Sequence, residues 1–208
     1  MEFPMTQAIA SPTLTSPQPN RSPDQQIRFP GNWESFELIQ QALADSPGAK
    51  LSFYNGTIEI LMPGAAHEKF AHIIGYLLTT FLLENGIKFV PSRQKDQVKQ
   101  GVATVQADES YCIGQEKDIP DLSIEVVFTS GGPSKLKIYA ALGVPEVWFW
   151  EDGVLSLYHL RSDEQTYEKI MVSELPGLDR LNLDLLQCCI LQAETDFPGA
   201  VAMLRAGN

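Results

Sequence analysis

The sequence predicts a single α/β domain in which a mixed β-sheet is flanked by helices. Short strand-like segments separated by turn residues recur along the chain. One long segment carries apolar residues at helical spacing, and a strand, a helix and a strand follow one another near residues 122–150. With 208 residues, of which 44% are hydrophobic and 20% charged, the chain can bury one ordinary core.

The two ends of the chain are expected to lie outside this domain. Residues 1–28 carry five prolines among Ser, Thr, Gln and Asn without apolar periodicity, which predicts a disordered arm. The arm lacks the basic start and apolar core of a signal peptide. The folded domain is predicted over residues 29–192, and residues 193–208 are expected to form a C-terminal tail.

The first half of the domain combines a helix, a hairpin and a second, longer helix. Asn32 is a candidate N-cap for a helix that ends near Ala44. Segments 51–54 and 57–61 flank Asn55-Gly56, a strong hairpin signal because both residues tolerate positive φ. The long helix that follows ends before Asn85-Gly86 and has a wide apolar stripe made of Phe70, Ile73, Ile74, Leu77, Leu78, Phe81 and Leu82.

The second half is predicted to complete the sheet. A helix from Pro133 to Leu142, closed by Gly143, links two strands. A hairpin is expected around residues 151–153, and a final helix over residues 177–191. The remaining strands are expected at residues 88–91, 101–106, 111–113, 122–128, 146–150, 154–159 and 167–172.

Charge and cysteine content limit the possible settings of the protein. The net charge of −11 and pI near 4.6 disfavour nonspecific binding to nucleic acid. The basic residues Lys88, Arg93, Lys95 and Lys99 either offset this charge on one face or form a solvated edge. The three cysteines, two of them adjacent, lack disulfide or zinc spacing, which indicates thiols in a reducing, cytoplasmic compartment. No run of about 18 apolar residues predicts a membrane span.

Two acidic residues stand out in the predicted sheet. Glu125 interrupts an apolar strand that is expected to be buried on both faces, where an unpaired carboxylate costs several kcal/mol. It is therefore either a metal ligand or half of a buried ion pair with a helix lysine. Asp108 lies on or near a preceding strand, although it also reads as a turn residue. Two carboxylates and a nearby lysine are typical of metal-dependent phosphodiesterases.

These residues belong to a longer resemblance. The rows PDLSIEV (120–126) and KLKIYAALGVPEVWFW (135–150), with YNGTIEI (54–60), Met62-Pro63, His67 and the DESY row (108–111), resemble the Uma-two family of restriction endonucleases in the PD-(D/E)xK nuclease superfamily. The resemblance covers roughly residues 30–160. It implies a restriction-endonuclease-like fold and an endonuclease that hydrolyses DNA phosphodiester bonds with a water activated by Mg²⁺ or Mn²⁺.

By this resemblance, Asp108 and Glu125 are the metal ligands. The lysine expected two residues after the acid is absent because Val127 stands there, so the resemblance assigns its role to Lys135, on the following helix. The alternative acid, Asp121, lies on the same strand as Glu125 but four residues away, about 13 Å, which is too far to share an ion. We expect Asp121 to begin the strand or to support the site.

The resemblance also places a histidine at position 67. His67 falls near the apolar stripe of the long helix, so it is a candidate catalytic residue, although a core histidine bonded to a backbone carbonyl gives the same pattern. Glu68 is better explained as a first-turn acid of that helix. No Gly-x-Ser-x-Gly segment or cysteine context indicates a nucleophilic enzyme.

Two further expectations concern activity and assembly. The acidic charge and the missing strand lysine favour, as an alternative, a nuclease-like domain that acts as a noncatalytic binding or assembly module. The aromatic strand Trp148-Phe149-Trp150 is expected to belong to the core and to an interface. This strand and the hairpin after it are expected to offer an edge or an apolar patch to a second copy in a homodimer.

Overall fold

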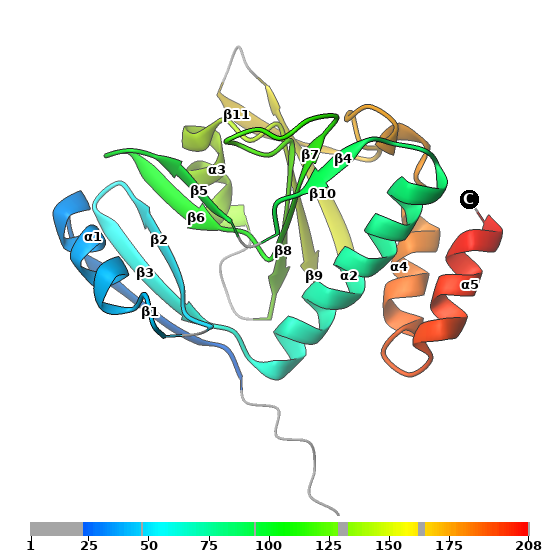
Figure 1. Cartoon of the computed structure of the whole chain (residues 1–208), viewed down its shortest axis with the longest axis horizontal. Helices are drawn as coiled ribbons and strands as arrows, with labels where there is room; N and C mark the ends of the chain where they lie inside the picture. The colour runs from blue at the N-terminus through cyan, green and yellow to red at the C-terminus, as the bar shows by residue number, and fades with distance from the viewer. Residues whose placement is uncertain (1–22, 47, 94, 129–132, 162–164, 208) are drawn as a thin grey trace, which may run out of the picture.

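The computed structural model describes residues 23–46, 48–93, 95–128, 133–161 and 165–207. Two β-sheets lie side by side in it, and helices cover their outer faces (Figure 1). Sheet A carries α1, whereas sheet B is enclosed by α2, α4 and α5 on one side and by α3 on the other. The predicted α/β class with a mixed sheet between helices is confirmed, and the architecture is consistent with a restriction-endonuclease-like fold.

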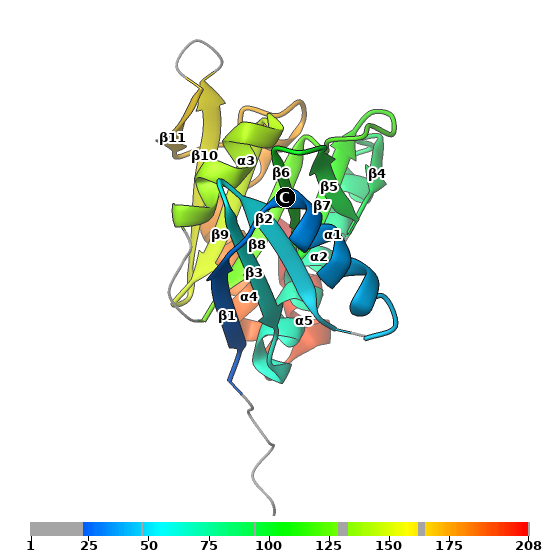
Figure 2. The same ribbon diagram turned by 90° about the vertical axis from the view of Figure 1, so that its left-hand side faces the viewer.

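Sheet A is antiparallel and has the strand order β1-β3-β2-β6-β5. The β2–β3 hairpin turns at Asn55 and Gly56, whose φ angles are 46° and 72°, as the sequence predicts. The Asn32 side chain caps α1 by accepting from Ser35 N at 2.9 Å. The elements are β1 (Gln25–Pro30), α1 (Trp33–Ala42), β2 (Lys50–Tyr54), β3 (Thr57–Met62), β5 (Asp96–Lys99) and β6 (Ala103–Gln106). Figure 2 shows this sheet from its outer side.

Sheet B has the order β11-β10-β9-β8-β7-β4, and only the β8–β9 pair is parallel. A parallel pair needs a crossover, which α3 provides. The strands are β4 (Phe89–Pro91), β7 (Glu109–Ile113), β8 (Leu122–Val127), β9 (Glu146–Glu151), β10 (Val154–Arg161) and β11 (Thr166–Ile170).

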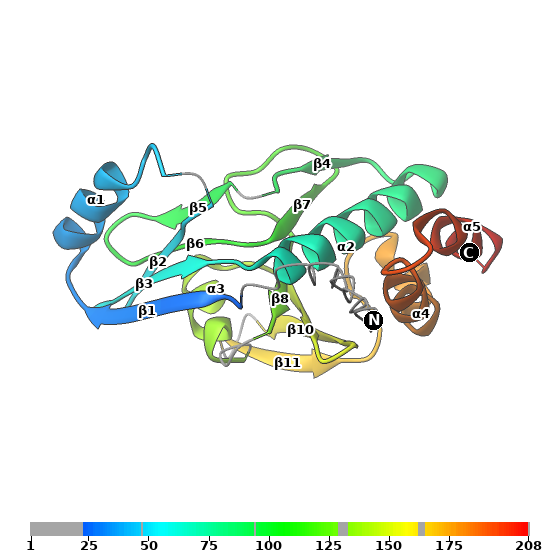
Figure 3. The ribbon, with the colours of Figure 1, turned by 90° about the horizontal axis from the view of Figure 1, so that it is seen from below.

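The helices divide the two faces of sheet B between them. Figure 3 shows α4 and α5 together at one end of the molecule and α1 at the opposite end. The helices around sheet B are α2 (Ala65–Glu84), α3 (Leu136–Leu142), α4 (Leu183–Gln192) and α5 (Phe197–Gly207). Two short 3₁₀ helices are η1 (Pro133–Lys135) and η2 (Leu178–Arg180). No helix in the described part of the chain is both long and apolar enough to cross a membrane.

Strand β8 is buried along its whole length, so its side chains alternate between two interiors. Ile124 and Val126 join the core beneath α2, while Val127 joins the smaller core beneath α3. The same alternation sends Glu125 toward α3. This burial on both faces is what the apolar run around Glu125 predicts.

The chain passes from sheet A to sheet B within two residues. Strand β6 ends at Gln106 and β7 begins at Glu109, so Ala107 and Asp108 form the link, and both are buried. The two sheets are also joined by the Gln97 amide, which donates to Ser123 Oγ at 2.9 Å. Asp108 therefore lies at the junction of the two sheets.

Several expected boundaries differ from the structure. Residues 25–28 of the expected disordered arm form most of β1, which pairs with β3; residues 1–22 lie outside the described part. The expected C-terminal tail contains α5, which buries Ala200, Val201 and Leu204. A second sheet and strand β5 were not predicted, because short strands with exposed faces carry little apolar pattern.

The aromatic strand is placed in the core but not at an edge. Trp148, Phe149 and Trp150 are at most 2% exposed, and β9 lies between β8 and β10. Their burial confirms the expectation that this strand belongs to the core. The strand therefore offers no free edge of its own to a second copy.

Candidate functional site

Asp108 lies against β8 on both sides of Glu125. Its backbone N donates to Ile124 O at 3.0 Å, and its Oδ2 accepts from Val126 N at 2.6 Å. Ile124 and Val126 are the neighbours of Glu125 in sequence, so Asp108 lies beside the backbone of Glu125, and, together with burial, its charge contributes to raising the pKa of Glu125. Each residue is 1% exposed. The tertiary structure thus brings together the two acids that are 17 residues apart in the sequence.

The first turns after β8 supply the partners of Glu125. Lys135 Nζ donates to Glu125 Oε2 at 2.7 Å, and the Tyr139 hydroxyl donates to Oε1. Lys135 and Tyr139 are four residues apart and therefore share one helical face, which lies on the sheet, whereas Lys137 is exposed. The Lys135–Glu125 contact is a buried ion pair, since the lysine side chain is 13% and the glutamate 1% exposed.

Burial and the charge of the partner residue shift the pKa values of Glu125 and Lys135 in opposite directions. Burial raises the pKa of Glu125 above its ordinary value, and the charge of Lys135 only partly offsets this effect. Burial alone would lower the pKa of Lys135, but the charges of Glu125 and Asp108 outweigh it and raise that pKa. The lysine is therefore held in its charged form.

Asp108 is bonded by groups from three separate elements. Lys50 Nζ, from the start of β2, donates to Oδ1; His67 Nε2, from α2, lies 2.8 Å from the same oxygen. Burial alone would raise the pKa of Asp108, but the His67 hydrogen bond and the charge of Lys50 lower it far below its usual range. Asp108 is accordingly ionised.

His67 lies between two carboxylates. Its Nδ1 is 2.9 Å from Asp24 Oδ2, and Asp24 Oδ1 accepts from Gly64 N at 2.7 Å. An ionised carboxylate only accepts hydrogen bonds, so both ring nitrogens of His67 have to carry protons. Burial would lower the pKa of His67, but its bonds with Asp108 and Asp24 raise it. The expected inward orientation is observed, with acidic partners in place of a backbone carbonyl.

Charges in this cluster are matched in number, and every member except the exposed Arg28 is buried or half-buried. Its acids are Asp24, Glu59, Asp108 and Glu125, and its cations are Arg28, Lys50, His67 and Lys135, with Arg28 bonded to Glu59. Among the described residues, no group of three or more His, Cys, Asp or Glu side chains is arranged to hold a metal ion. Any ion at this position would have to rely on the two carboxylates and on non-acidic ligands.

A polar cleft leads from the surface to this cluster. Its outer part has a volume of about 230 Å³ and is lined by residues that include Arg28, Tyr54, Glu59, Lys135 and Lys137. A much smaller inner hollow, about 10 Å³, is lined by Lys50, Glu59 and Lys135 among others. Glu59 and Lys135 border both hollows, so the two hollows lie next to each other and are lined by the lysines that bind Asp108 and Glu125.

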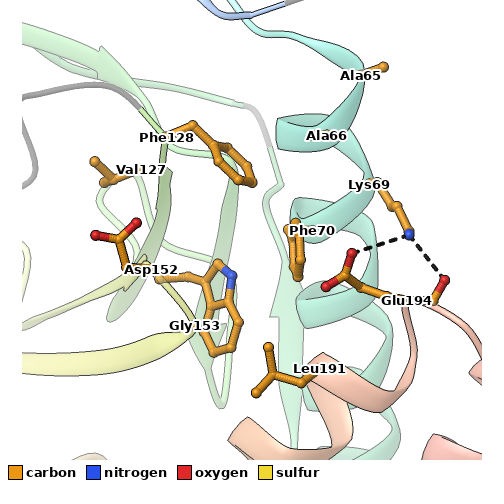
Figure 4. A pocket seen from close by; sticks show the side chains of 11 residues that line it. Ala65, Ala66, Lys69, Phe70, Val127, Phe128, Asp152, Gly153, Leu191 and Glu194 are labelled. Carbon is orange, nitrogen blue, oxygen red and sulfur yellow. Dashed lines mark hydrogen bonds and ion pairs between the residues drawn. The ribbon is translucent and has the colours of Figure 1, made fainter. Parts of the chain in front are cut away.

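A larger cavity of about 540 Å³ lies elsewhere, between α2, the end of β8 and α4 (Figure 4). Its walls are mainly apolar and include Phe70, Phe128, Trp150 and Leu191, and Lys69 bonds Glu194 at its rim. Asp108 and Glu125 line neither this cavity nor the polar cleft, but their bonded partners Lys50 and Lys135 line the cleft. Size alone would select this cavity, but the chemistry of the buried acids is associated with the smaller cleft.

Other residues singled out in the sequence are placed outside the cluster. Asp121 directly precedes β8, where its carboxylate accepts from Ile113 N at 2.7 Å and pairs with Lys117. Within the basic group, Arg93 pairs with Glu109 and Lys95 with Glu116. These contacts fit a solvated charged edge better than a free basic face.

Four charged members of the cluster and the hydroxyl partner of Glu125 escaped the sequence interpretation, namely Asp24, Arg28, Lys50, Glu59 and Tyr139. Asp24 fell within the expected disordered arm, and Lys50 lies more than 50 residues from its partner Asp108. Only the tertiary structure brings them to the site. Tyr139 did give a signal, because it follows Lys135 at helical spacing, but its bond to Glu125 was not foreseen.

The fold and the paired acids define a protein of the restriction-endonuclease-like class. A family model with the description "Putative restriction endonuclease" (Uma2) matches residues 33–193, and the chain belongs to this family. The family description implies a nucleic-acid substrate, and restriction-endonuclease-like families generally depend on a divalent metal. A search of curated proteins gives no significant match.

Proposed function

We propose that this protein is an endonuclease that hydrolyses DNA phosphodiester bonds with the help of Mg²⁺ or Mn²⁺ bound by Asp108 and Glu125. The observation that carries the proposal is that two buried carboxylates, Asp108 in the link before β7 and Glu125 on β8, lie near each other with the Lys135 amino group 2.7 Å from Glu125. Two acids and a lysine are what such a reaction needs: ligands for the ion and a cation beside the reacting phosphate.

The carboxylates have capacity left for an ion. The oxygens of Asp108 accept from Lys50, His67 and Val126, and those of Glu125 accept from Lys135 and Tyr139. Because a carboxylate has about four acceptor sites, at least one remains on each residue. Mg²⁺ commonly takes one or two carboxylates and fills its other positions with water. The donor set therefore fits the ion that the family implies.

Each residue of the cluster then has a distinct task. When bound, a divalent ion supplies positive charge to the phosphate oxygens and makes water more acidic. Lys135 takes the role of the strand lysine, whose position is occupied by Val127. It orients the attacking water or neutralises charge on the phosphate. His67, in this proposal, is a positioning residue, because it holds Asp108 through Nε2 and is itself held by Asp24.

A second function is favoured by a specific observation. Both carboxylates are already paired with lysines, and the chain has a net charge of −11. These features also fit a nuclease-like domain that binds a partner without catalysis. In that case Asp108 and Glu125 would stabilise the junction of the sheets and would not bind an ion.

Metal titration separates the two functions. Calorimetry with Mg²⁺ and Mn²⁺ should detect binding to the native protein and its loss in Asp108→Asn and Glu125→Gln. Glu109→Gln is the matched control, since Glu109 is a buried acid next in sequence to Asp108 that pairs with Arg93. Plasmid cleavage on the same samples should follow metal binding. No binding at millimolar ion by the native protein would establish the noncatalytic alternative.

The proposal includes a cytoplasmic location and a homodimer. The location follows from the unpaired cysteines, of which Cys112 and Cys189 are buried. The homodimer has lost the support of the aromatic strand, which lies inside the sheet. Light scattering tests it directly: a mass of 23.0 kDa, that of one chain, would exclude it.

A further inference from the structure

The outer part of the polar cleft is the place where the molecule is best suited to bind an anion. Arg28, Lys135 and Lys137 line it together with a single acid, Glu59, so the lining carries two more positive than negative charges. The whole chain, by contrast, carries a net charge of −11. A local excess of cations in an acidic protein concentrates anions at that position.

Lys137 differs from the other two cations in its ion pairing. Arg28 is bonded to Glu59 and Lys135 to Glu125, whereas Lys137 makes no ion pair with any residue that the structure describes. It is exposed and lines the outer part of the cleft. An incoming anion therefore meets Lys137 before it reaches Lys135.

The dimensions of the cleft restrict the form of a nucleic acid that can use it. Its outer volume is about 230 Å³, the inner hollow is about 10 Å³, and the carboxylates beyond are 1% exposed. A duplex presents its phosphates on a stiff, broad surface that cannot enter such a recess. A single strand can turn one phosphate inward and unstack the neighbouring base.

One aromatic side chain stands at the right place for that base. Tyr54, at the end of β2 and next to the Asn55-Gly56 turn, is half-buried and lines the same cleft as the three cations. Base stacking on an aromatic ring beside a basic groove is the usual means by which single strands are bound without sequence preference.

We propose that this cleft binds a phosphate of single-stranded nucleic acid, with Arg28, Lys135 and Lys137 neutralising the phosphate and Tyr54 stacking on an adjacent base. The inference rests on the proposed function for its position beside Asp108 and Glu125, and it specifies the substrate class of that site. Single-stranded DNA and RNA share the chemistry that the cleft recognises.

Binding of labelled oligonucleotides in the presence of a chelator tests the proposal without cleavage. Fluorescence anisotropy is measured with single-stranded DNA, single-stranded RNA and a DNA duplex of the same sequence. We expect at least one single strand to bind more tightly than the duplex. Lys137→Glu should weaken that binding by about fivefold or more at low salt and reduce the salt slope by about 0.7, the value for one phosphate contact.

Arg180→Glu is the control for the general effect of charge. It makes the same change of charge at an exposed residue of η2. This 3₁₀ helix lies beyond the end of α2, because Gly177, which precedes it, packs against Ile87. The affinity of this variant should match that of the native protein. Equal weakening by both variants, or tighter binding of the duplex, would overturn the proposal.

The two proposals fail in different ways. Specific weakening by Lys137→Glu without any cleavage in Mg²⁺ or Mn²⁺ would support the single-strand cleft and refute the proposed endonuclease. Cleavage of duplex DNA that is unaffected by Lys137→Glu would support the endonuclease and refute the single-strand cleft.

Discussion

At the scale of single residues, the environment of Glu125 decides how the site is to be understood. The carboxylate is enclosed on a buried strand and receives hydrogen bonds from Lys135 and Tyr139. Both readings of Glu125 that the sequence allowed, a metal ligand and half of an ion pair, remain compatible with this arrangement, because an ion pair leaves acceptor sites unused. Substitution of the lysine separates its structural from its chemical contribution.

Lys135→Ala should lower the free energy of unfolding by about 3 kcal/mol, since it leaves a buried carboxylate without its cation. Urea denaturation measures the change. Lys117→Ala provides the matched control: this lysine also pairs with an acid, Asp121, but its side chain is 41% exposed. Lys117→Ala should lower the free energy of unfolding by less than about 1 kcal/mol. Equal costs for the two variants would contradict a buried ion pair at Glu125.

Moving the lysine tests its chemical role. Lys135→Ala is expected to reduce cleavage by roughly 100-fold, a typical contribution of a group that handles a proton. Adding Val127→Lys returns an amine two residues beyond Glu125 on the same strand face, about 6.6 Å along the strand. The double variant should recover measurable cleavage. Recovery by Val127→Arg but not by Val127→Lys would argue against proton transfer, since arginine stays charged.

At the scale of elements, two short connections build the site. The link from β6 to β7 brings Asp108 to the junction of the sheets, and the 3₁₀ turn that leads into α3 directs Lys135 and Tyr139 onto β8. Helix α2 begins beside the same junction, so His67 in its first turn reaches Asp108. Asp108, His67 and Lys135 therefore depend on where an element begins or ends, whereas Glu125 lies within β8.

Helix α1 offers a test of the local signals that shape such ends. Asn32→Ala removes the side-chain cap to Ser35 N and should destabilise the protein by about 1 kcal/mol. Thermal unfolding measures the loss. Asn32→Asp keeps an acceptor at the same place and should retain most of the stability. If the two variants are equally unstable, the cap does not explain the start of this helix.

At the scale of the whole molecule, the two ends of the chain contribute to the fold. Strand β1 forms an edge of sheet A, and Asp24 just before it holds His67. At the other end, α5 packs against α2 and α4. Neither end was assigned to the domain from the sequence, because the first is rich in proline and the second follows a break in the apolar pattern.

The packing of α5 is open to a direct test. Leu204→Ala removes a side chain that is 1% exposed and should cost about 3 kcal/mol of folding free energy. Leu83→Ala, at a leucine that is 65% exposed, should change stability by less than about 0.5 kcal/mol. Chemical denaturation of both variants gives the comparison. A negligible effect of Leu204→Ala would restore the expectation of a terminal tail.

Local sequence patterns predicted many elements of the fold. The Asn55-Gly56 turn, the stripe of α2 and the apolar run of β8 each depend on neighbours in sequence, and each is found where it was predicted. Strand β5 was missed because it has only four residues and three of them are not buried. The existence of a second sheet was missed for a related reason, since strand pairing between distant segments leaves no periodic signal.

By itself, the sequence determined the α/β class and the unusual presence of Glu125 in a buried strand, because these follow from periodicity, turn chemistry and the cost of burying charge. The family followed from the resemblance of particular segments, and the family model confirms it. Only the tertiary structure decided which groups surround that charge. Lys50 and His67, from β2 and α2, meet at Asp108, and Asp24 holds the other nitrogen of His67. Such a cluster depends on distances in space between residues far apart in the chain, which no local pattern of amino acids records.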